Sequence, residues 1–231
     1  MRKATIPEGL TRHETAGGLS RQGIVDSTRF VQLSEDRTFT VRLGIDEATL
    51  EGYLFPETYF FSMESDEEDV LRQLVKQFHQ VMNNDALARL DTIGLSIHQA
   101  VTLASIVERE AQAASERPLI AGVFMRRLSL NRRLESCATV EYALGVHKKR
   151  LTNADLRVKS PFNTYRHRGL PPAPIGSPGK AALIASLYPK KTEYLYFVAR
   201  GDGTHIFSRT NVEHEAAKRQ VRRLEKSRQL N

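Results

Sequence analysis

The sequence predicts an α+β fold in which several amphipathic helices pack against a few short strands. Apolar residues recur at helical spacing over residues 66–92, 96–111 and 116–130, which is typical of helices that bury one face. Residues 192–200 are rich in β-branched and aromatic types, and the Gly201-Asp202-Gly203 turn then leads into a second strand. At 231 residues, the chain can hold one large domain, or one domain with a small appendage.

The charge and the cysteine content exclude some classes of protein and leave others open. Lysine and arginine exceed aspartate and glutamate by 34 − 27 = +7, which suits an anionic polymer or membrane headgroups but is also common elsewhere. A single cysteine excludes an internal disulfide and a multi-cysteine metal site, and it fits a reducing compartment and a cell envelope equally well. The sequence has no long apolar run and no signal-like segment at residues 1–10, so we expect no membrane span in it.

The first 45 residues predict a strand, a turn and a helix that depend on the rest of the chain. Residues 2–6 form the expected strand and Pro7-Glu8-Gly9 the turn. Thr11 and Glu14 have the spacing of a capping box, which starts a helix. Residues 27–45 have weak periodicity and predict a second short helix or a connector. A piece of this size cannot bury a core of its own.

Residues 50–61, LEGYLFPETYFF, alternate aromatic side chains in the manner of strands, but Pro56 interrupts the pattern. We therefore expect an edge strand, a bulge or two short strands. With Glu51 and Glu57 interleaved, the aromatic residues would form a surface able to stack on sugar rings and accept hydroxyl protons. In the alternative, the aromatic side chains belong to the core, which we favour for Phe55 and Phe61 more than for Tyr53.

Two further helices are predicted, and the first of them, at residues 66–92, is interpreted as scaffold. Residues 66–92 predict one long amphipathic helix, and acidic residues at its start favour the helix dipole. The helix over residues 116–130 carries an arginine cluster near its end. This cluster predicts a solvated helix terminus or, as the minority alternative, an anion site, and it consists of Arg126, Arg127, Arg132 and Arg133.

The helix between them places a carboxyl group among apolar residues. A capping box at residues 96–99 starts this helix. Glu108 lies seven residues after Val101 and four after Ala104, on one apolar stripe, whereas Glu110 is expected to turn away from that stripe. Burial raises the pKa of a carboxyl group, and a carboxylic acid that stays protonated near neutral pH can act as a general acid. A buried glutamate satisfied by an arginine or by backbone donors explains the same pattern, and periodicity alone does not separate the two.

Residues 134–178 form the least regular part of the chain. A short strand is expected at residues 139–144. Asn163, Thr164 and Tyr165 then precede four prolines, which stiffen the backbone and predict a rigid surface loop. Rigid loops of this composition commonly hold binding residues on a scaffold. Besides the hairpin described above, the chain closes with two expected helices, at residues 179–187 and about 210–228.

Several kinds of site have no motif in this sequence. It has no glycine-rich nucleotide loop, no HExxH or GxSxG motif and no Cys/His ligand set, so we expect neither a metal nor a cofactor. The histidines lie scattered, without metal-ligand spacing, and Cys137 predicts only a small residue. Aromatic and basic residues are not interleaved as in a stacking groove, which argues against nucleic acid as a partner.

Five motifs, in the right order, resemble the endolytic murein transglycosylase family, also called YceG-like. They are LEGYLFPETYFF, LASIVEREA, ATVEYALG, SPFNTYRHRGLPPAPIGSPG and EYLYFVARGDGTHIFS, and the resemblance spans about residues 46–220. Residues 3–25 resemble the end of the LysM-like subdomain that precedes the catalytic domain in that family. The resemblance therefore implies a mixed α+β catalytic domain over residues 46–231, preceded by a partial LysM-like subdomain and connector over residues 1–45.

The resemblance also implies an activity. Members cleave the glycan strands of peptidoglycan between N-acetylmuramic acid and N-acetylglucosamine and leave 1,6-anhydromuramic ends. Glu108 matches the family's catalytic glutamate, and one carboxyl group suffices because the sugar's own C6 hydroxyl is the nucleophile. Asn163, Thr164 and Tyr165 match a motif that we expect to hold the sugar. The other residues that we expect to line or support the substrate cleft are Glu51, Tyr53, Glu57 and Glu135.

Location and partners follow from the same resemblance. The family normally acts outside the cytoplasm from an inner-membrane anchor, a segment that this sequence lacks, and peptidoglycan synthases are candidate partners. Residues 135–140 read ESCATV where the family usually has QSDPTV. Glu135 adds a charge that would raise the pKa of Glu108 if the two lie close together. This departure leaves a non-catalytic glycan-binding protein as the alternative, and a hydrolase that uses water as a weaker one.

Overall fold

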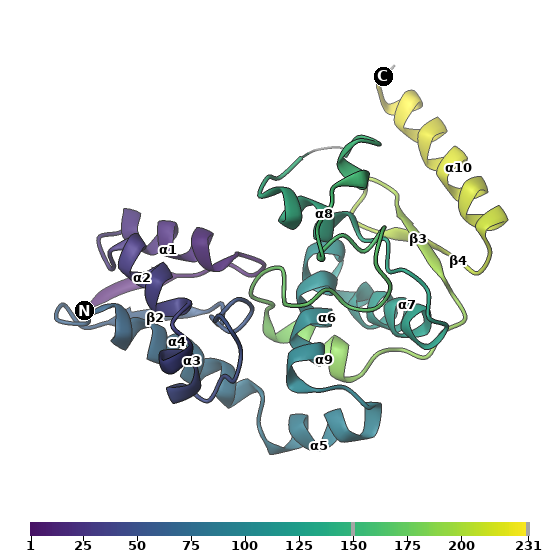
Figure 1. The fold of residues 1–231 in the computed structure, drawn as a ribbon. Coiled ribbons are helices and arrows are strands. Elements are labelled where there is room, and N and C mark those ends of the chain that lie inside the picture. The colour runs from purple at the N-terminus through teal and green to yellow at the C-terminus, as the bar shows by residue number, and fades with distance from the viewer. Residues whose placement is uncertain (149–150, 230–231) are drawn as a thin grey trace.

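The computed structural model describes residues 1–148 and 151–229, and it has the α+β fold that the sequence predicts. The elements, in chain order, are β1 (Arg2–Thr5), α1 (Arg12–Arg21), α2 (Ser27–Ser34), α3 (Arg37–Arg42), β2 (Thr58–Phe61), α4 (Glu67–Val81), α5 (Asn84–Ile93), α6 (Ile97–Glu110), α7 (Arg117–Ser129), α8 (Cys137–Leu144), α9 (Lys180–Leu187), β3 (Tyr196–Ala199), β4 (His205–Ser208) and α10 (Asn211–Gln229). Figure 1 shows two groups of elements: β1, β2 and α1–α4 in one, and α6–α9 with β3 and β4 in the other. Helix α5 lies below α9 and α6 of the second group, and α10 extends beyond that group to the C-terminus.

In the first group, the strand at the start of the chain pairs with the strand that precedes α4. Strand β1 runs antiparallel to β2, with Arg2 opposite Phe61. The predicted capping box is confirmed, because the Thr11 side chain accepts a hydrogen bond from the amide of Glu14 and the Glu14 carboxylate accepts one from the amide of Thr11. Whether this part is a LysM-like subdomain, and where it ends, stay predictions.

Two segments contain more helices than predicted, and in each case a side chain caps the additional helix. Residues 27–45 hold α2 and α3, because Asp26 and Asp36 each accept hydrogen bonds from the first amides of a helix. The single helix expected over residues 66–92 is wrong. It divides into α4 and α5 at Asn83, whose side chain caps α5 by accepting from the amide of Ala86.

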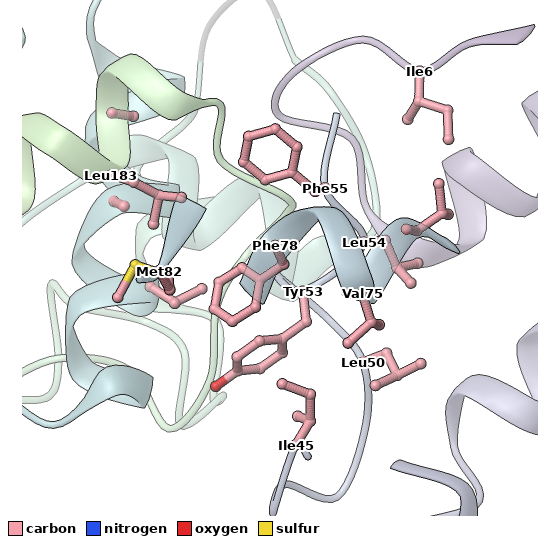
Figure 2. Packing of buried hydrophobic residues seen from close by; sticks show 14 of the residues in the cluster. Ile6, Ile45, Leu50, Tyr53, Leu54, Phe55, Val75, Phe78, Met82 and Leu183 are labelled. Atoms are coloured by element: carbon pink, nitrogen blue, oxygen red, sulfur yellow. The ribbon is translucent and has the colours of Figure 1, made fainter. Parts of the chain in front are cut away.

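Residues 50–61 contribute mainly to the core. Only Thr58–Phe61 forms a strand, and the residues before it are turns. The alternative in which the aromatic side chains are core is confirmed for Phe55 and Phe61, and it extends to Tyr53, whose exposed fraction is 2%. Tyr53 lies beside Phe78 with the two rings edge to face at 5.1 Å, as Figure 2 shows. This aromatic segment therefore joins α4 to the rest of the core.

Helix α6 is the central element of the second group. Its residues from Ala100 to Val107 are all buried, and α7 and α9 pack on it. The predicted capping box is present, with Ser96 and Gln99 exchanging hydrogen bonds. Since α6 is apolar on every side, its sequence pattern does not say which neighbour each face contacts.

The short strand expected at residues 139–144 is wrong, because these residues belong to helix α8. Thr139 and Val140 favour a strand by their branching, but both are fully buried on the helix. Gly145 ends α8 with a left-handed φ of 66°. The predicted hairpin is confirmed by the antiparallel β3–β4 pair, and the helices expected at residues 116–130 and 179–187 are confirmed as α7 and α9.

Candidate functional site

A cavity of about 470 Å³ lies between the last turn of α6, the start of α8 and the first turns of α10. Its walls carry carboxyl, guanidinium, thiol, phenol and imidazole groups. The side chains that the argument uses are those of Glu110, Arg127, Glu135, Cys137, Tyr165 and His214. Among the described residues that line this cavity, Glu110 is present and Glu108 is not.

Glu110 is the carboxyl group that the fold buries at this cavity. Burial is the largest influence on its pKa and raises it. The hydroxyl of Ser136 and the backbone amide of Ala138 donate hydrogen bonds to the carboxyl group, and these bonds, together with the charge of His205, act in the opposite direction. A carboxylic acid in this setting holds a proton above its usual range and still has donors ready for its ionised form.

Glu110 turns away from the stripe of Val101 and Ala104, as expected, but α6 is also buried on the side to which it turns. Glu110 lies seven residues after Leu103 and four after Ile106, and both are fully buried. This second apolar stripe is the signal in the sequence that points to Glu110. The stripe of Val101 and Ala104 gives an equally good pattern, so the sequence does not select Glu110 over Glu108.

Glu108 lies in a different environment. Its side chain is 6% exposed, and its Oε1 accepts from the guanidinium of Arg117 at 2.9 Å. Its Oε2 accepts from the backbone amide of Gly179 at 3.0 Å. An arginine and a backbone donor are the two partners that the structural alternative requires. The catalytic role of Glu108 stays a prediction, and nothing in this geometry aims its carboxyl group at the cavity.

The predicted sugar-binding loop divides into side chains that build the loop and side chains that face the cavity. Asn163 is fully buried and donates to the carbonyls of Leu156 and Val158, so its amide fixes the loop. Thr164 is buried as well and accepts from the amide of Ser136. Tyr165 lines the cavity, and its hydroxyl lies 3.2 Å from the Cys137 sulfur.

Glu135 also lines the cavity, and a buried arginine holds it. Nη1 of Arg127 donates to the Glu135 carboxylate at 2.9 Å, and Nε of Arg127 donates to the carbonyl of Leu195. The backbone of Glu135 is left-handed, with φ 54°, and its amide donates to the carbonyl of Thr164. Arg127 is therefore a structural residue of this wall. The prediction that Arg127 belongs to a solvated arginine cluster is therefore wrong, because its side chain is buried.

The three residues predicted in residues 50–57 do not lie at this cavity. Glu51 lines a second cavity, of about 430 Å³, with Arg109 and Glu141. Its buried carboxyl group accepts from the amide of Arg12, and burial raises the pKa of Glu51 to about 7. Tyr53 is buried in the core with its hydroxyl 3.0 Å from Nδ1 of His98, and Glu57 is exposed. We retain Glu51 as a candidate near the cleft, Tyr53 has a structural role in the core, and the role of Glu57 stays a prediction.

Two histidines near Glu110 were not singled out from the sequence. His205 on β4 is 9% exposed, and its Nδ1 lies 2.7 Å from Oε2 of Glu116. His214 on α10 stacks on Tyr196 at 5.1 Å, and its Nδ1 is buried without a hydrogen-bond partner in the described structure. Burial is the first cause that lowers the pKa of His214, so a neutral ring faces the cavity.

The described residues contain no group of three His, Cys, Asp or Glu side chains arranged to hold a metal ion. Among the helices in the described part of the chain, none is by itself both long and apolar enough to cross a membrane. Helices α5 and α6 reach that length only together, across a bend of 90°.

Comparison with known proteins gives a consistent result. The model of the YceG-like family matches residues 1–220. The endolytic murein transglycosylase of Bacillus subtilis is 33% identical over 93% of this chain and 63% of its own length, and that of Streptococcus pneumoniae strain D39 is 30% identical over 90% and 42%. A crystal structure of a yceG-like protein from Listeria monocytogenes superposes with a TM-score of 0.86 at 34% identity, covering 94% of this chain and 76% of that one. The chain spans less than two thirds of the length of these curated relatives.

Proposed function

The chain belongs to the YceG-like family, and on that basis we propose that it is an endolytic murein transglycosylase. Its substrate is the glycan strand of peptidoglycan, which it cleaves between N-acetylmuramic acid and N-acetylglucosamine. The product carries a 1,6-anhydromuramic end. The names of the relatives support the substrate class, and the cavity beside Glu110 supports the chemistry.

Glu110 is the acid and base of the proposed reaction. Its protonated carboxyl group donates the proton to the glycosidic oxygen, and the C1–O bond breaks as the muramic ring becomes oxocarbenium-like. The C6 hydroxyl of the same sugar then attacks C1, and the Glu110 carboxylate takes the hydroxyl proton. The carboxyl group ends the cycle protonated, so one side chain serves both steps and water is not consumed.

The surroundings of Glu110 suit both halves of this cycle. Burial raises its pKa, so the carboxyl group holds a proton for the first step. The hydroxyl of Ser136 and the amide of Ala138 stabilise the carboxylate that exists between the steps. The single observation that carries the proposal is this buried carboxyl group on the wall of a cavity.

Other cavity residues have proposed binding roles. Tyr165 offers a phenol and Glu135 a carboxylate held by Arg127, and both suit the hydroxyl and amide groups of an N-acetylated sugar. His214 offers a buried ring nitrogen without a partner in the described structure. Asn163 and Thr164 act through the loop that they hold.

Two matched variants test the assignment of the acid. Purified murein sacculi are incubated with the wild-type protein, Glu110→Gln or Glu108→Gln, and anhydro-muropeptides are measured by mass spectrometry. We expect the wild type and Glu108→Gln to release anhydro products and Glu110→Gln to release none. The opposite pattern would assign the acid to Glu108.

The same measurement separates the alternative functions. Reducing ends in place of anhydro ends would indicate a hydrolase that uses water. Binding to sacculi without turnover by a folded wild-type protein would indicate a non-catalytic glycan-binding protein and would overturn the proposed activity.

The proposed substrate sets the location and partners. Peptidoglycan is assembled in the cell envelope, so we place the site of action there, at the outer face of the inner membrane. Peptidoglycan synthases are the candidate protein partners, and termination of nascent strands is the candidate role.

A further inference from the structure

A third cavity, of about 830 Å³, lies along α7 and is larger than the cavities at Glu110 and Glu51. Its walls are one side of α7 from Leu119 to Ser129, residues 189–194 and Arg209. The reaction proposed at Glu110 uses none of these residues. The α7 cavity is therefore a separate candidate site for a ligand.

Backbone contacts form the walls of the α7 cavity. The amide of Lys190 donates to the carbonyl of Pro118 at 2.8 Å. A Cβ at Gly122 would overlap the carbonyl oxygen of Lys190, so glycine lets the segment after α9 lie directly on α7. The amide of Leu195 donates to the carbonyl of Ser208 at 2.9 Å, which joins the other end of this segment to the β3–β4 pair. Figure 1 shows the segment passing α7 on its way from α9 to β3. The cavity is therefore preformed, as ligand sites commonly are.

Part of the lining of the α7 cavity is apolar. Leu119, Met125, Pro189 and the ring of Tyr194 line it, and each is partly buried. The Tyr194 ring packs against Phe207 with 5.8 Å between the centroids, which fixes its position. Covering apolar side chains on a concave wall is favourable. We therefore expect a ligand that has small apolar groups as well as polar ones.

The charged side chains of the lining are mainly cationic, and all of them are exposed. Four cations face one carboxylate, that of Glu193, which gives an excess of 4 − 1 = +3, and the cations are Arg126, Lys190, Lys191 and Arg209. Nε of Arg209 lies 3.4 Å from Oε2 of Glu193. The other three cations form no ion pair within the part of the chain that the structure describes. A concave surface with this excess of positive charge attracts anions.

The shape and the charge together favour a short acidic peptide as the ligand. A flat membrane surface cannot enter a concave cavity, and a single phosphate ion would leave the apolar side chains uncovered. Carboxylates spaced along a peptide suit separate lysine ammonium groups, which act as point charges. Small apolar side chains of the same peptide suit Leu119 and Met125.

The α7 cavity lies next to the cavity at Glu110. Tyr194 lines the first and Tyr196 the second, and two residues of an extended chain span about 7 Å. Helix α7 also contributes to both, with Arg126 in the first and Arg127 in the second. One ligand can therefore occupy the two cavities together.

We propose that the α7 cavity binds the peptide carried by the muramic acid whose sugar ring occupies the cavity at Glu110. The peptides of peptidoglycan are attached to muramic acid and have free carboxylates, which would pair with Lys190 and Lys191. Their small side chains would cover the apolar part of the lining. The choice of this substrate rests on the proposed function, whereas binding of a free acidic peptide does not. The protein should therefore cleave strands that carry peptides in preference to bare glycan.

Two variants change the charge of the α7 cavity in opposite directions. The double variant Lys190→Gln/Lys191→Gln removes two cations, and Glu193→Gln removes the carboxylate. All three side chains are exposed, so neither variant alters the core. Lys76→Gln, at an exposed position on α4, is the control for loss of a cation elsewhere. Circular dichroism and thermal melting establish that each variant is folded.

The first readout is calorimetric titration at low salt with the free peptide that an amidase releases from murein. The same peptide with its carboxylates converted to amides is the second probe. We expect the wild type and Lys76→Gln to bind the acidic peptide equally, the double variant to bind it about tenfold more weakly, and Glu193→Gln to bind it about twofold more tightly. The amidated peptide should bind about tenfold more weakly to the wild type. Equal affinity for the two peptides, or wild-type affinity in the double variant, would overturn the proposal.

The second readout is the ratio of kcat/KM for peptide-bearing strands to kcat/KM for strands that an amidase has stripped of peptide. We expect a ratio well above one in the wild type and in Lys76→Gln, and a ratio close to one in the double variant. An equal ratio in the wild type and the double variant would contradict peptide binding at the α7 cavity. Failure of every protein to cleave either substrate would count against the proposed function alone, because the titration needs no activity.

Discussion

The hydroxyl of Ser136 donates a hydrogen bond to Oε1 of Glu110, although Ser136 is the N-cap residue of α8. Serine at this position usually caps the helix itself, and here its side chain makes no cap bond. The N-cap residue of α8 therefore donates its side-chain hydrogen bond to the carboxyl group at the end of α6 and not to its own helix. The bond favours the ionised form of Glu110 and opposes the effect of burial.

Replacing Ser136 by alanine is expected to move the pH dependence of strand cleavage. The hydrogen bond lowers the pKa of Glu110, so its loss raises that pKa and shifts the alkaline limit of activity upward. The measurement is kcat/KM against pH. Ser129→Ala is the matched control, because that exposed hydroxyl only donates to the carbonyl of Arg126. Coincident profiles for Ser136→Ala and Ser129→Ala would contradict the role of Ser136.

Glu51 is expected to make the fold less stable as pH rises. Its pKa is raised from 4.5 to about 7 in the folded state, so its contribution is complete below pH 4.5 and is lost as pH rises through 7. The difference of 7 − 4.5 = 2.5 pH units corresponds to about 3 kcal/mol at most. In Glu51→Gln, the fall in the free energy of unfolding between pH 5 and pH 8 should be smaller than in the wild type. Denaturant unfolding at both pH values measures this fall, and Glu64→Gln, at an exposed position, is the control. An equal fall in Glu51→Gln and Glu64→Gln would refute the raised pKa of Glu51.

Gly179→Ala is expected to destabilise the protein by about 1 kcal/mol because its methyl group displaces the Glu8 side chain. The backbone of Gly179 has φ −76°, which alanine adopts without strain, so the cost lies in the contact alone. Adding Glu8→Ala should therefore remove most of the destabilisation caused by Gly179→Ala. A double-mutant cycle measures the coupling between positions 8 and 179. Gly18→Ala is the control, since nothing lies near that position on α1, and alanine there should stabilise the helix. Full additivity in the cycle would show that Gly179 and Glu8 do not interact as described.

Tyr53→Phe is expected to leave glycan binding unchanged and to cost about 1 kcal/mol of stability. Its hydroxyl lies against Nδ1 of His98 in the core, away from the cavity at Glu110. Tyr165→Phe is the matched change at the cavity, and we expect it to weaken binding to soluble murein strands. Calorimetric titration of both variants decides between the roles. Weaker binding in Tyr53→Phe with unchanged stability would restore the sequence-based expectation of a cleft residue.

The sequence predicted the local features well because their causes are local. Both capping boxes and the glycine turn between β3 and β4 depend on residues a few positions apart. The strand expected at residues 139–144 failed because burial on a helix outweighs the preference of Thr139 and Val140. Local preference is a weak guide wherever tertiary packing supplies most of the energy.

The sequence pattern of α6 does not decide between Glu108 and Glu110 as the catalytic acid. Both carboxyl groups extend apolar stripes on α6, so periodicity favours neither. The difference comes from what packs on each side. Arg117 and Gly179 meet Glu108, whereas Ser136 and a cavity meet Glu110. None of these neighbours lies on α6 itself. The folded structure is therefore needed to show which of them contacts each carboxyl group.

The closure of Gly9 onto Ser177 also bears on how the chain folds during synthesis. These residues bond to each other although they lie 177 − 9 = 168 positions apart in the sequence. During vectorial synthesis, Glu8 leaves the ribosome long before Gly176 and Gly179 exist, so α6 must first fold without the contact at its last turn. Contacts of such long separation form late and slow the final step of folding. The nascent chain should thus acquire its ordered site only when the segment around residue 179 has emerged.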